Sequence, residues 1–438
     1  MPSCIGGGTT ADSALSARDG THGNSTTNDD DTCIKDGASL RRHILLLKCL
    51  YFMNGVSTTT WGRFGTIYYL EKGLTSSEIG VIEGVMPAVQ MIFIPLWGFV
   101  ADKIHSRKTI VLGTQFTSSC VLCTLAIPII YRSYTNILTV SVIMSLFVST
   151  GILDAYTLDI LGKKHFKEYG RIRLWHAFAW GVGALSMGYL TDLYGVDVNF
   201  IIYGALSTIN IIALGMVVPR HTASERQLLN TNIHFIDFLC AICAPRMLFF
   251  YFEMTVVGAG MAIVERLLFI YLKGDLHTST TFCGATVLAT VLVELPLFHY
   301  AYLLLQIFGH HGMFLIGMLA YVVRVFLYTL LSVYTVNWIF AIEILHGVTI
   351  ACVWSAAVEF AKVNVPRELA STSQTFLAAI LSCFGGGVGS ILGGYIMENR
   401  GSVYLYRGSS IVVASVMVAH LLYILVFEKR FIVSWVSL

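Results

Sequence analysis

The chain has 438 residues, of which 55% are hydrophobic and 12% are charged, and its mean hydropathy is +0.71. This composition excludes a soluble globular domain and indicates a protein that crosses the membrane several times. The formal net charge of +2 is close to balance, so the charge gives no indication of a nucleic-acid partner.

The first 42 residues contain no apolar run and are rich in Gly, Ser, Thr and Asp, which is typical of a disordered tail. Beyond them we find twelve apolar segments of about 20 residues or more, the length that a helix needs to cross a bilayer. We therefore expect an all-α integral membrane protein with spans at 43–70, 78–101, 108–131, 136–160, 171–192, 198–218, 246–272, 279–304, 311–333, 336–360, 369–397 and 403–428.

The longest connection between these spans, at 219–245, divides them six and six. We predict a six-helix bundle at 43–218, a central cytosolic loop at 219–245, a second six-helix bundle at 246–428 and a short tail at 429–438. Lysine and arginine are enriched on the cytosolic side of membrane proteins. Seventeen of them flank one side of the predicted spans and five flank the other. We therefore expect both termini, and the tail at 1–42, in the cytosol, at the plasma membrane or an internal membrane.

The two predicted bundles repeat a sequence. GVGALSMGYL at 181–190 matches GVGSILGGYI at 387–396, and each is followed five residues later by another glycine. YLEKGLTS at 69–76 is similar to YLKGDLHTS at 271–279, with a nearly equal offset. Two matches in the same span order favour a duplicated, pseudo-symmetric six-helix unit, the arrangement in which secondary transporters form a site between two halves.

Small residues recur every fourth position along the eleventh span in two stripes: Gly385, Gly389 and Gly393, and Gly386, Ser390 and Gly394. Such stripes let helix backbones approach closely. Static packing and a sliding gate surface explain the two stripes equally well.

Four ionisable side chains fall near the middle of the predicted membrane, on three consecutive spans: Glu294, Arg324, Glu343 and His346. A helix places Glu343 and His346, three residues apart, on one face. A charge at the bilayer centre costs about 2.5–3.5 kcal/mol on insertion scales, so such residues usually mark a substrate or proton path. We interpret the four as a proton-coupling and substrate-binding cluster that lines one chamber; structural ion pairs are the alternative.

Two further layers of polar residues lie outside this midplane cluster. An outer layer forms either an extracellular gate or a set of side chains that reach toward the interface: Arg63, Glu83, Glu265 and Arg266. An inner layer comprises Asp154, Asp159, His176 and Glu253. A bridge from Asp154 to Arg171, Arg173 or His176 is either a cytosolic contact that breaks when the inside opens or a static link between the fourth and fifth spans.

Polar and aromatic side chains on the first and tenth spans suit the binding of a sugar or nucleoside ring. The candidates for the substrate cavity are Asn54, Thr58, Trp61, Arg63, Tyr68 and Trp354. Packing or an interfacial position is the alternative for the aromatic members.

No cofactor or metal is predicted. The paired cysteines Cys120/Cys123 and Cys240/Cys243 lie in or beside apolar segments and lack histidines at zinc-finger spacing. His310 and His311 are expected in a loop, where metal binding is improbable.

PLWGFVADKIHSRK at 95–108 resembles the signature loop of the major facilitator superfamily. The small Gly98 permits a close helix contact, and the charged residues imply a cytosolic gate; the positions in register are Gly98, Asp102, Lys103, Arg107 and Lys108. The usual glycine before the basic pair is absent. The corresponding loop of the second half, IFGHHGMF at 307–314, lacks the acid and the basic pair.

A closer resemblance is to the branch of that superfamily with the oligosaccharide–proton and nucleoside–proton symporters and the domain-containing protein 6-like group. It covers about 43–428 and includes EYGRIRLWHAFAWGVG at 168–183, VELPLF at 293–298, Arg324 and EILHGVTIACVWSAA at 343–357. The resemblance implies a twelve-helix transporter whose first and seventh helices face each other across the cavity. It also implies a proton role for the midplane cluster, without choosing the carboxyl that carries the proton.

We therefore predict a secondary active transporter that couples protons to a small polar organic solute, sugar-like or nucleoside-like, by alternating access as a monomer. A uniporter or exporter of amphipathic compounds, and a transporter-like receptor that no longer moves its ligand, are the alternatives. An enzyme is not predicted, because the sequence has no nucleophile–base pair, metal-ligand spacing or phosphate loop.

Overall fold

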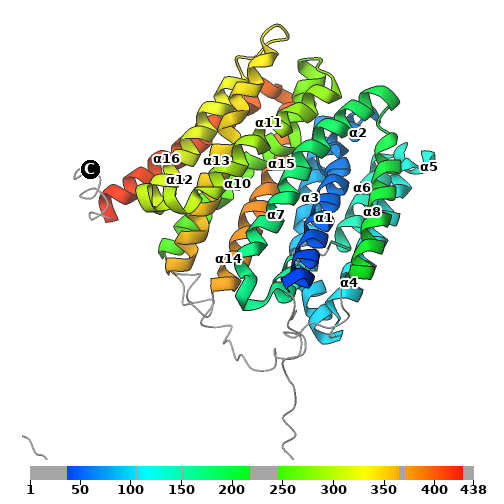
Figure 1. Ribbon diagram of the computed structural model, residues 1–438. Coiled ribbons are helices and arrows are strands. Elements are labelled where there is room, and N and C mark those ends of the chain that lie inside the picture. The colour runs from blue at the N-terminus through cyan, green and yellow to red at the C-terminus, as the bar shows by residue number, and fades with distance from the viewer. Residues whose placement is uncertain (1–36, 105, 149–151, 218–244, 365–369, 428–438) are drawn as a thin grey trace, which may run out of the picture.

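A computed structural model describes residues 37–104, 106–148, 152–217, 245–364 and 370–427 (Figure 1). Throughout these residues the regular structure is helical, as the composition predicts. Residues 37–42, which we assigned to the tail, already belong to the first helix. Most of the predicted tails and of the central loop lie outside the described residues, at 1–36, 218–244 and 428–438.

The amino-terminal half forms one set of helices in Figure 1. Its elements are α1 (Gly37–Gly62), α2 (Gly65–Glu71), α3 (Ser76–Ile104), α4 (Arg107–Cys123), the short η1 (Thr124–Ala126), α5 (Pro128–Tyr131), α6 (Tyr134–Leu146), α7 (Ile152–Tyr194) and α8 (Val198–Val217).

The carboxy-terminal half lies beside it. Its elements are α10 (Pro245–Ile270), the π-helical η3 (Tyr271–Asp275), α11 (Thr280–His299), α12 (Ala301–Tyr328), the short η4 (Val336–Trp338), α13 (Ile339–Asn364), α14 (Ala370–Ala378), the π-helical η6 (Ala379–Gly385), α15 (Gly386–Arg400) and α16 (Ser402–Phe427).

The described helices account for all twelve predicted spans, six in each half. Nine helices of this part of the chain are long and apolar enough to cross a membrane on composition alone. The other three spans involve α1 with its basic first turns, the 13-residue α6, and α7. Their composition is more polar or their helix is shorter, yet each lies in line with its apolar neighbours in Figure 1.

Helix α7 contains both the end of the fourth predicted span and the whole of the fifth. A straight helix of its 43 residues would be about 65 Å long, twice the thickness of the bilayer core. Asp154 and Arg173 would then lie about 28 Å apart. Their side chains instead form an ion pair at 3.7 Å, so the chain turns back on itself between them. The connection that we expected between 160 and 171 therefore exists as a turn, but it retains helical hydrogen bonding.

The expected loop around His310 and His311 is not present, because both residues lie within α12. Gly309 has a φ of 64°, which interrupts the helix between Phe308 and His310 and which glycine adopts without steric cost. His311 follows this break and is buried, with 2% of its surface exposed. The span therefore begins near its predicted position, and the break at Gly309 separates it from the short helical segment before it.

The two halves meet along two equivalent helix pairs, α7 with α11 and α3 with α15. Gly188 and Gly394, which correspond in the repeated sequence, make the same contact in each pair. A Cβ atom at Gly188 would lie 2.5 Å from the carbonyl oxygen of Thr280, and one at Gly394 would lie 2.4 Å from that of Ser76. Only glycine fits at such distances, so the structure supports the duplicated unit that the repeat predicts.

The two glycine stripes of the eleventh span have different partners. A Cβ at Gly389 would lie 2.2 Å from the carbonyl oxygen of Ala259, so the first stripe packs against α10 within its own half. Gly394, in the second stripe, contacts α3 of the other half. Static packing therefore explains the first stripe, whereas the second lies on the surface between the halves.

Residues near the axis that relates the halves meet their own equivalents. Arg63 and Glu265 are 202 positions apart, and the Arg63 guanidinium donates a hydrogen bond to the backbone oxygen of Glu265. Glu71 and Lys273 have the same offset and form an ion pair at 3.2 Å. Direct contact between equivalent positions is possible only close to a two-fold axis.

We expect Gly394→Ala to destabilise the protein by about 1–3 kcal/mol, because the new methyl group forces α3 and α15 apart. The melting temperature of the purified protein in detergent measures this. The matched control is Gly408→Ala in α16, where a Cβ would meet nothing within 4 Å. That variant should be neutral or more stable by up to about 1 kcal/mol. Equal melting temperatures for the two variants would contradict the close approach.

Candidate functional site

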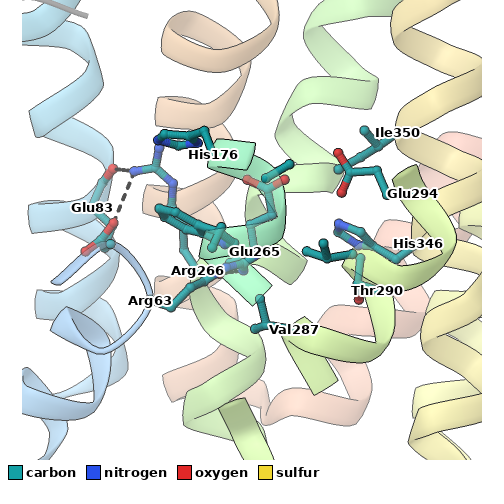
Figure 2. A pocket seen from close by; sticks show the side chains of 14 residues that line it. Arg63, Glu83, His176, Glu265, Arg266, Val287, Thr290, Glu294, His346 and Ile350 are labelled. Carbon is teal, nitrogen blue, oxygen red and sulfur yellow. Dashed lines mark hydrogen bonds and ion pairs between the residues drawn. The ribbon is translucent and has the colours of Figure 1, made fainter. Parts of the chain in front are cut away.

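A cavity of about 380 Å³ lies between the two halves (Figure 2). Its walls come from the junction of α1 and α2 and from α3, α7, α10, α11 and α13. A cleft or cavity with a few convergent polar groups is the usual form of a small-molecule site. The ionisable residues of the lining include the whole predicted outer layer and two of the four midplane residues: Arg63, Glu83, His176, Glu265, Arg266, Glu294 and His346.

His346 connects the cavity wall to a buried arginine. Its imidazole lines the cavity, and Arg324 lies behind it with no exposed surface. The Arg324 guanidinium donates a hydrogen bond to Nδ1 of His346. A ring nitrogen that accepts a hydrogen bond carries no proton, so His346 is neutral in this arrangement and has its proton on Nε2.

Glu343 also lies behind the cavity wall. Its carboxylate is 3% exposed and accepts hydrogen bonds from Thr290 Oγ1 at 2.9 Å and from the Tyr328 hydroxyl. Each carboxylate oxygen therefore has a hydrogen-bond donor. The structure therefore divides the predicted cluster, because Arg324 and Glu343 are buried and do not line the central cavity as we expected.

Glu294 faces open space on two sides. It lines the central cavity and a larger one of about 780 Å³ on the predicted cytosolic side. Within the described part of the chain, no residue donates a hydrogen bond to its carboxylate. Figure 2 shows this carboxylate and the His346 imidazole on the same side of the cavity. Glu294 is thus the midplane carboxyl with the most direct access to a solute or to water.

The predicted outer layer forms two bridges between the halves. Arg266 on α10 makes an ion pair with the Glu83 carboxylate on α3 at 3.2 Å and also donates to the Glu83 backbone oxygen. Arg63 bridges in the opposite direction, to the Glu265 backbone oxygen. Both arginines line the cavity, so their side chains point into the space between the halves and do not extend toward an interface.

A second cavity of about 340 Å³ lies within the amino-terminal half and contains Asn54 and Thr58. His176 lines both this cavity and the central one. Asp154 accepts a hydrogen bond from Tyr51 at 2.6 Å and pairs with Arg173, whereas Arg171 pairs with Glu168 at 2.9 Å. Because the Asp154–Arg173 pair links the two arms of α7 within one half, this geometry favours the static alternative.

The aromatic candidates for the substrate cavity have different surroundings. Trp354 lines the 780 Å³ cavity. Trp61 packs against Tyr68, with ring centroids 5.4 Å apart, and Tyr68 is fully buried and donates to the Leu125 backbone oxygen at 2.7 Å. Neither Trp61 nor Tyr68 lines any of the three cavities described above. The packing alternative therefore applies to these two residues.

The signature loop is only partly described. A Cβ at Gly98 would meet nothing within 4 Å, so the close helix contact that we expected there is not made in this conformation. Lys103 is exposed at the end of α3, and the Lys108 ammonium donates to the backbone oxygen of Gly215 on α8. The side chains of Asp102 and Arg107 lie outside the described residues, as does that of Asp159.

Glu253, predicted for the inner layer, belongs to a polar chain inside the carboxy-terminal half. Its carboxylate is 1% exposed and lies 2.9 Å from Nδ1 of His420 on α16. The other ring nitrogen of His420, Nε2, lies 3.1 Å from Nδ1 of His311. All three residues come from one half, so this chain is separate from the central cavity.

Sequence reasoning missed the two residues that hold Glu343, namely Thr290 and Tyr328. Each lies four positions from a charge that we did select, Thr290 from Glu294 and Tyr328 from Arg324. Residues four apart share a helix face, so a search for hydrogen-bonding side chains at that spacing would have found them.

We expect Tyr328→Phe to lower stability by about 1.5–3 kcal/mol, because a buried carboxylate loses one hydrogen-bond donor. Thermal melting of the purified protein measures the loss. Tyr334→Phe is the control, since Tyr334 is 96% exposed and should tolerate the change. If the two variants have the same melting temperature, the hydroxyl of Tyr328 does not hold Glu343.

Comparison with known proteins adds sequence relatives along most of the chain. Residues 44–408 match the profile of the MFS_1 like family. The maltose permease of Geobacillus stearothermophilus is 25% identical over 387 residues, which cover 85% of this chain and 92% of the permease. Major facilitator superfamily domain-containing protein 6-like protein B of Xenopus laevis is 23% identical over 340 residues, which cover 73% of this chain and 52% of that protein.

Among solved structures, the crystal structure of the nucleoside transporter NupG is similar, with a TM-score of 0.76 and 16% identity. The similarity covers 86% of this chain and 98% of that chain. At this identity the comparison shows the fold alone. It confirms the twelve-helix, two-bundle architecture, and the sequence relatives confirm the resemblance to the permeases and to the 6-like group.

Proposed function

Because this chain belongs to the MFS_1 like family and is therefore a multi-pass major facilitator transporter, not an enzyme, we propose that it moves a small polar organic solute together with a proton. The two halves rock about the central cavity and open it to each side of the membrane in turn. One observation carries the proposal: Glu294, a carboxylate without a donor among the described residues, shares the cavity between the halves with the neutral imidazole of His346.

Glu294 is the proposed proton carrier. An ionised carboxylate that loses water without gaining a hydrogen-bond donor is strongly destabilised. Binding a proton removes that penalty, so the cavity closes around Glu294 more easily when it is protonated. Glu343 is less suited to this role, because Thr290 and Tyr328 already donate to its carboxylate oxygens and only 3% of the residue is exposed.

His346 is the proposed solute contact. With Nδ1 occupied by Arg324, its Nε2–H remains as a donor on the cavity side. His346 therefore keeps one fixed tautomer, which suits recognition of a hydroxyl or carbonyl oxygen.

The proposed solute is a sugar or a nucleoside. The central cavity combines Glu294, His346 and the two arginines with the flat surface of Trp180, which stacks on His176 at 6.4 Å between ring centroids. Hydrogen-bonding groups around an aromatic surface suit a polar ring. One relative is named for maltose and one similar structure for nucleosides, which supports testing these two classes first.

Uptake into liposomes that contain the purified protein tests the proposal. Labelled disaccharides and nucleosides are supplied outside, with the external medium two pH units more acidic than the lumen. The proposal expects one class to accumulate above equilibrium and a protonophore to abolish that accumulation. Entry that stops at equilibrium and ignores the gradient identifies a uniporter, and the absence of entry with retained binding identifies a receptor.

An exporter of amphipathic compounds is the second candidate, favoured by the 780 Å³ cavity. Its lining includes Phe298, Tyr302 and Trp354 beside Arg171 and Arg173, a combination that suits an apolar molecule with a polar end. Competition separates the candidates. An exporter should lose solute binding to amphipathic competitors at low concentration, whereas a sugar or nucleoside symporter should not.

A further inference from the structure

The helix ends that follow the repeated sequence each carry one acidic residue. GYLTDLYG at 188–195 ends α7, and GYIMENRG at 394–401 ends α15. Both stretches begin with the glycine that touches the opposite half, and both end in a glycine with positive φ, 82° and 86°. Asp192 and Glu398 lie one helical turn after the first glycine of each stretch.

Each of these carboxylates is hydrogen-bonded to the first turn of a helix in the opposite half. Asp192 accepts from the backbone N–H groups of Thr280 and Thr281, at 2.8 and 2.7 Å, and from the Thr281 hydroxyl at 2.6 Å. Glu398 accepts from the backbone N–H of Ser77 at 2.9 Å. Ser77 and Thr281 are each the second residue of their helix, α3 and α11, so the two contacts are equivalent.

A helix start is a favourable place for a carboxylate. The first backbone N–H groups of a helix have no partner within the helix, and this end of the helix dipole is positive. In most proteins the capping side chain comes from the same chain segment. Here both helix starts do have such a cap, Ser279 on α11 and the Thr75–Glu78 pair on α3. The bonds to Asp192 and Glu398 are added from the other half of the molecule, so they exist only while the halves touch at this end. Figure 1 shows that the start of α11 lies at the same end of the molecule as α2.

We propose that Asp192 and Glu398 are the gate residues that hold the predicted outer side of this transporter closed. When the halves rock apart on that side, both carboxylates leave their helix starts and water takes their place. The two bonds therefore favour the conformation that opens to the other side. This inference depends on family membership and the movement of two halves, but not on proton coupling or on the identity of the solute.

The pair places one carboxylate on each side of the axis, with three hydrogen bonds at Asp192 and one at Glu398. Loss of either carboxylate leaves the other half of the gate intact, so each single change should weaken closure without abolishing it. Asp197 offers a matched comparison, because it is an exposed acidic residue beside the same end of α7. Its partner, Lys72 at 3.3 Å, belongs to its own half, so that bond is unchanged when the halves separate.

Spin labels on the two halves test the proposal. Arg132→Cys and Tyr334→Cys place one label in each half on the predicted outer side, in a background whose exposed native cysteines are serine, with the protein in lipid nanodiscs. Pulsed electron paramagnetic resonance then measures the population with a long distance between labels. Asp192→Ala or Glu398→Ala removes the accepting oxygen and should raise that population relative to the short-distance one by about fivefold, the factor expected for one lost helix cap.

The double variant should raise the ratio by about 25-fold, because independent effects multiply. Asp197→Ala should leave it unchanged. An unchanged ratio in both single variants overturns the proposal, as does a shift of equal size in Asp197→Ala. A lower melting temperature without a change in the distance distribution also overturns it, since that result assigns the two carboxylates a purely structural role. If the double variant does not fold, the single variants decide the question.

Discussion

Glu294→Gln should abolish accumulation of the solute against its gradient and leave its exchange at equilibrium intact. A gradient of two pH units is worth about 2.7 kcal/mol per proton, so the accumulation ratio should fall from about 100 to about 1. The amide cannot bind or release the proton, but it keeps the shape of the side chain on the cavity wall. Uptake and counterflow in liposomes measure the two quantities separately.

The control is Glu343→Gln, which makes the same chemical change one layer deeper. Its amide oxygen still accepts from Thr290 or Tyr328, so accumulation should persist. The opposite result, with accumulation lost in Glu343→Gln and kept in Glu294→Gln, assigns the proton to Glu343. Loss of exchange as well as accumulation in Glu294→Gln would show that this residue holds the solute or the fold instead.

Arg324→Met should destabilise the protein by about 3–5 kcal/mol, the usual cost of removing one partner from a buried charge pair. Arg324 has no exposed surface, and its Nε and Nη2 have no hydrogen-bond partner among the described residues. Its guanidinium donates a hydrogen bond to His346 and lies 5.6 Å from the centre of the Tyr321 ring. Glu343 is a buried acidic residue on the same helix as His346 and is the candidate partner for this charge.

A double variant identifies the partner. If the charges of Arg324 and Glu343 balance each other, Arg324→Met with Glu343→Gln should recover most of the melting temperature lost by Arg324→Met alone. A double-mutant cycle gives the coupling directly. No recovery would show that the two charges are independent and that the arginine contributes through His346 alone.

The sequence predicted the spans well because most of them are apolar runs long enough to cross the bilayer. The polar connection between 160 and 171 was harder to place. Its composition is that of a loop, but its lysines and glutamate are good helix formers, and the chain turns while it stays helical. Local composition does not contain the contact between Asp154 and Arg173 that reveals the turn.

The depth of each residue along its span was enough to select the ionisable residues near the cavity. It was not enough to decide which of them line it. Glu294 and His346 line the space between the halves, whereas Glu343, one turn from His346, is turned toward Tyr328. A helix face is set by the packing of its neighbours, which a single sequence does not specify. Trp61 and Tyr68 show the same limit, since aromatic side chains serve equally in a core and in a binding site.

Asp192 and Glu398 escaped sequence reasoning for another reason. Their partners are backbone N–H groups, which every helix start offers, so no complementary side chain marks them. The repeat itself was the available signal. Extending the match between 181–190 and 387–396 by a few residues aligns the two acids, and only the structure shows that both reach across to the opposite half.

The contacts on the two-fold axis restrict how such a molecule can be assembled. At an axis position a residue meets its own counterpart, so a protein built from two identical copies of either half would bring Arg63 toward a second arginine, or Lys273 against a second lysine. Like charges at such short range repel. The present chain avoids this by carrying opposite charges at these positions, Glu71 against Lys273, with Arg63 beside Glu265. Neither half can therefore substitute for the other, and each should pair with its complement in preference to a copy of itself.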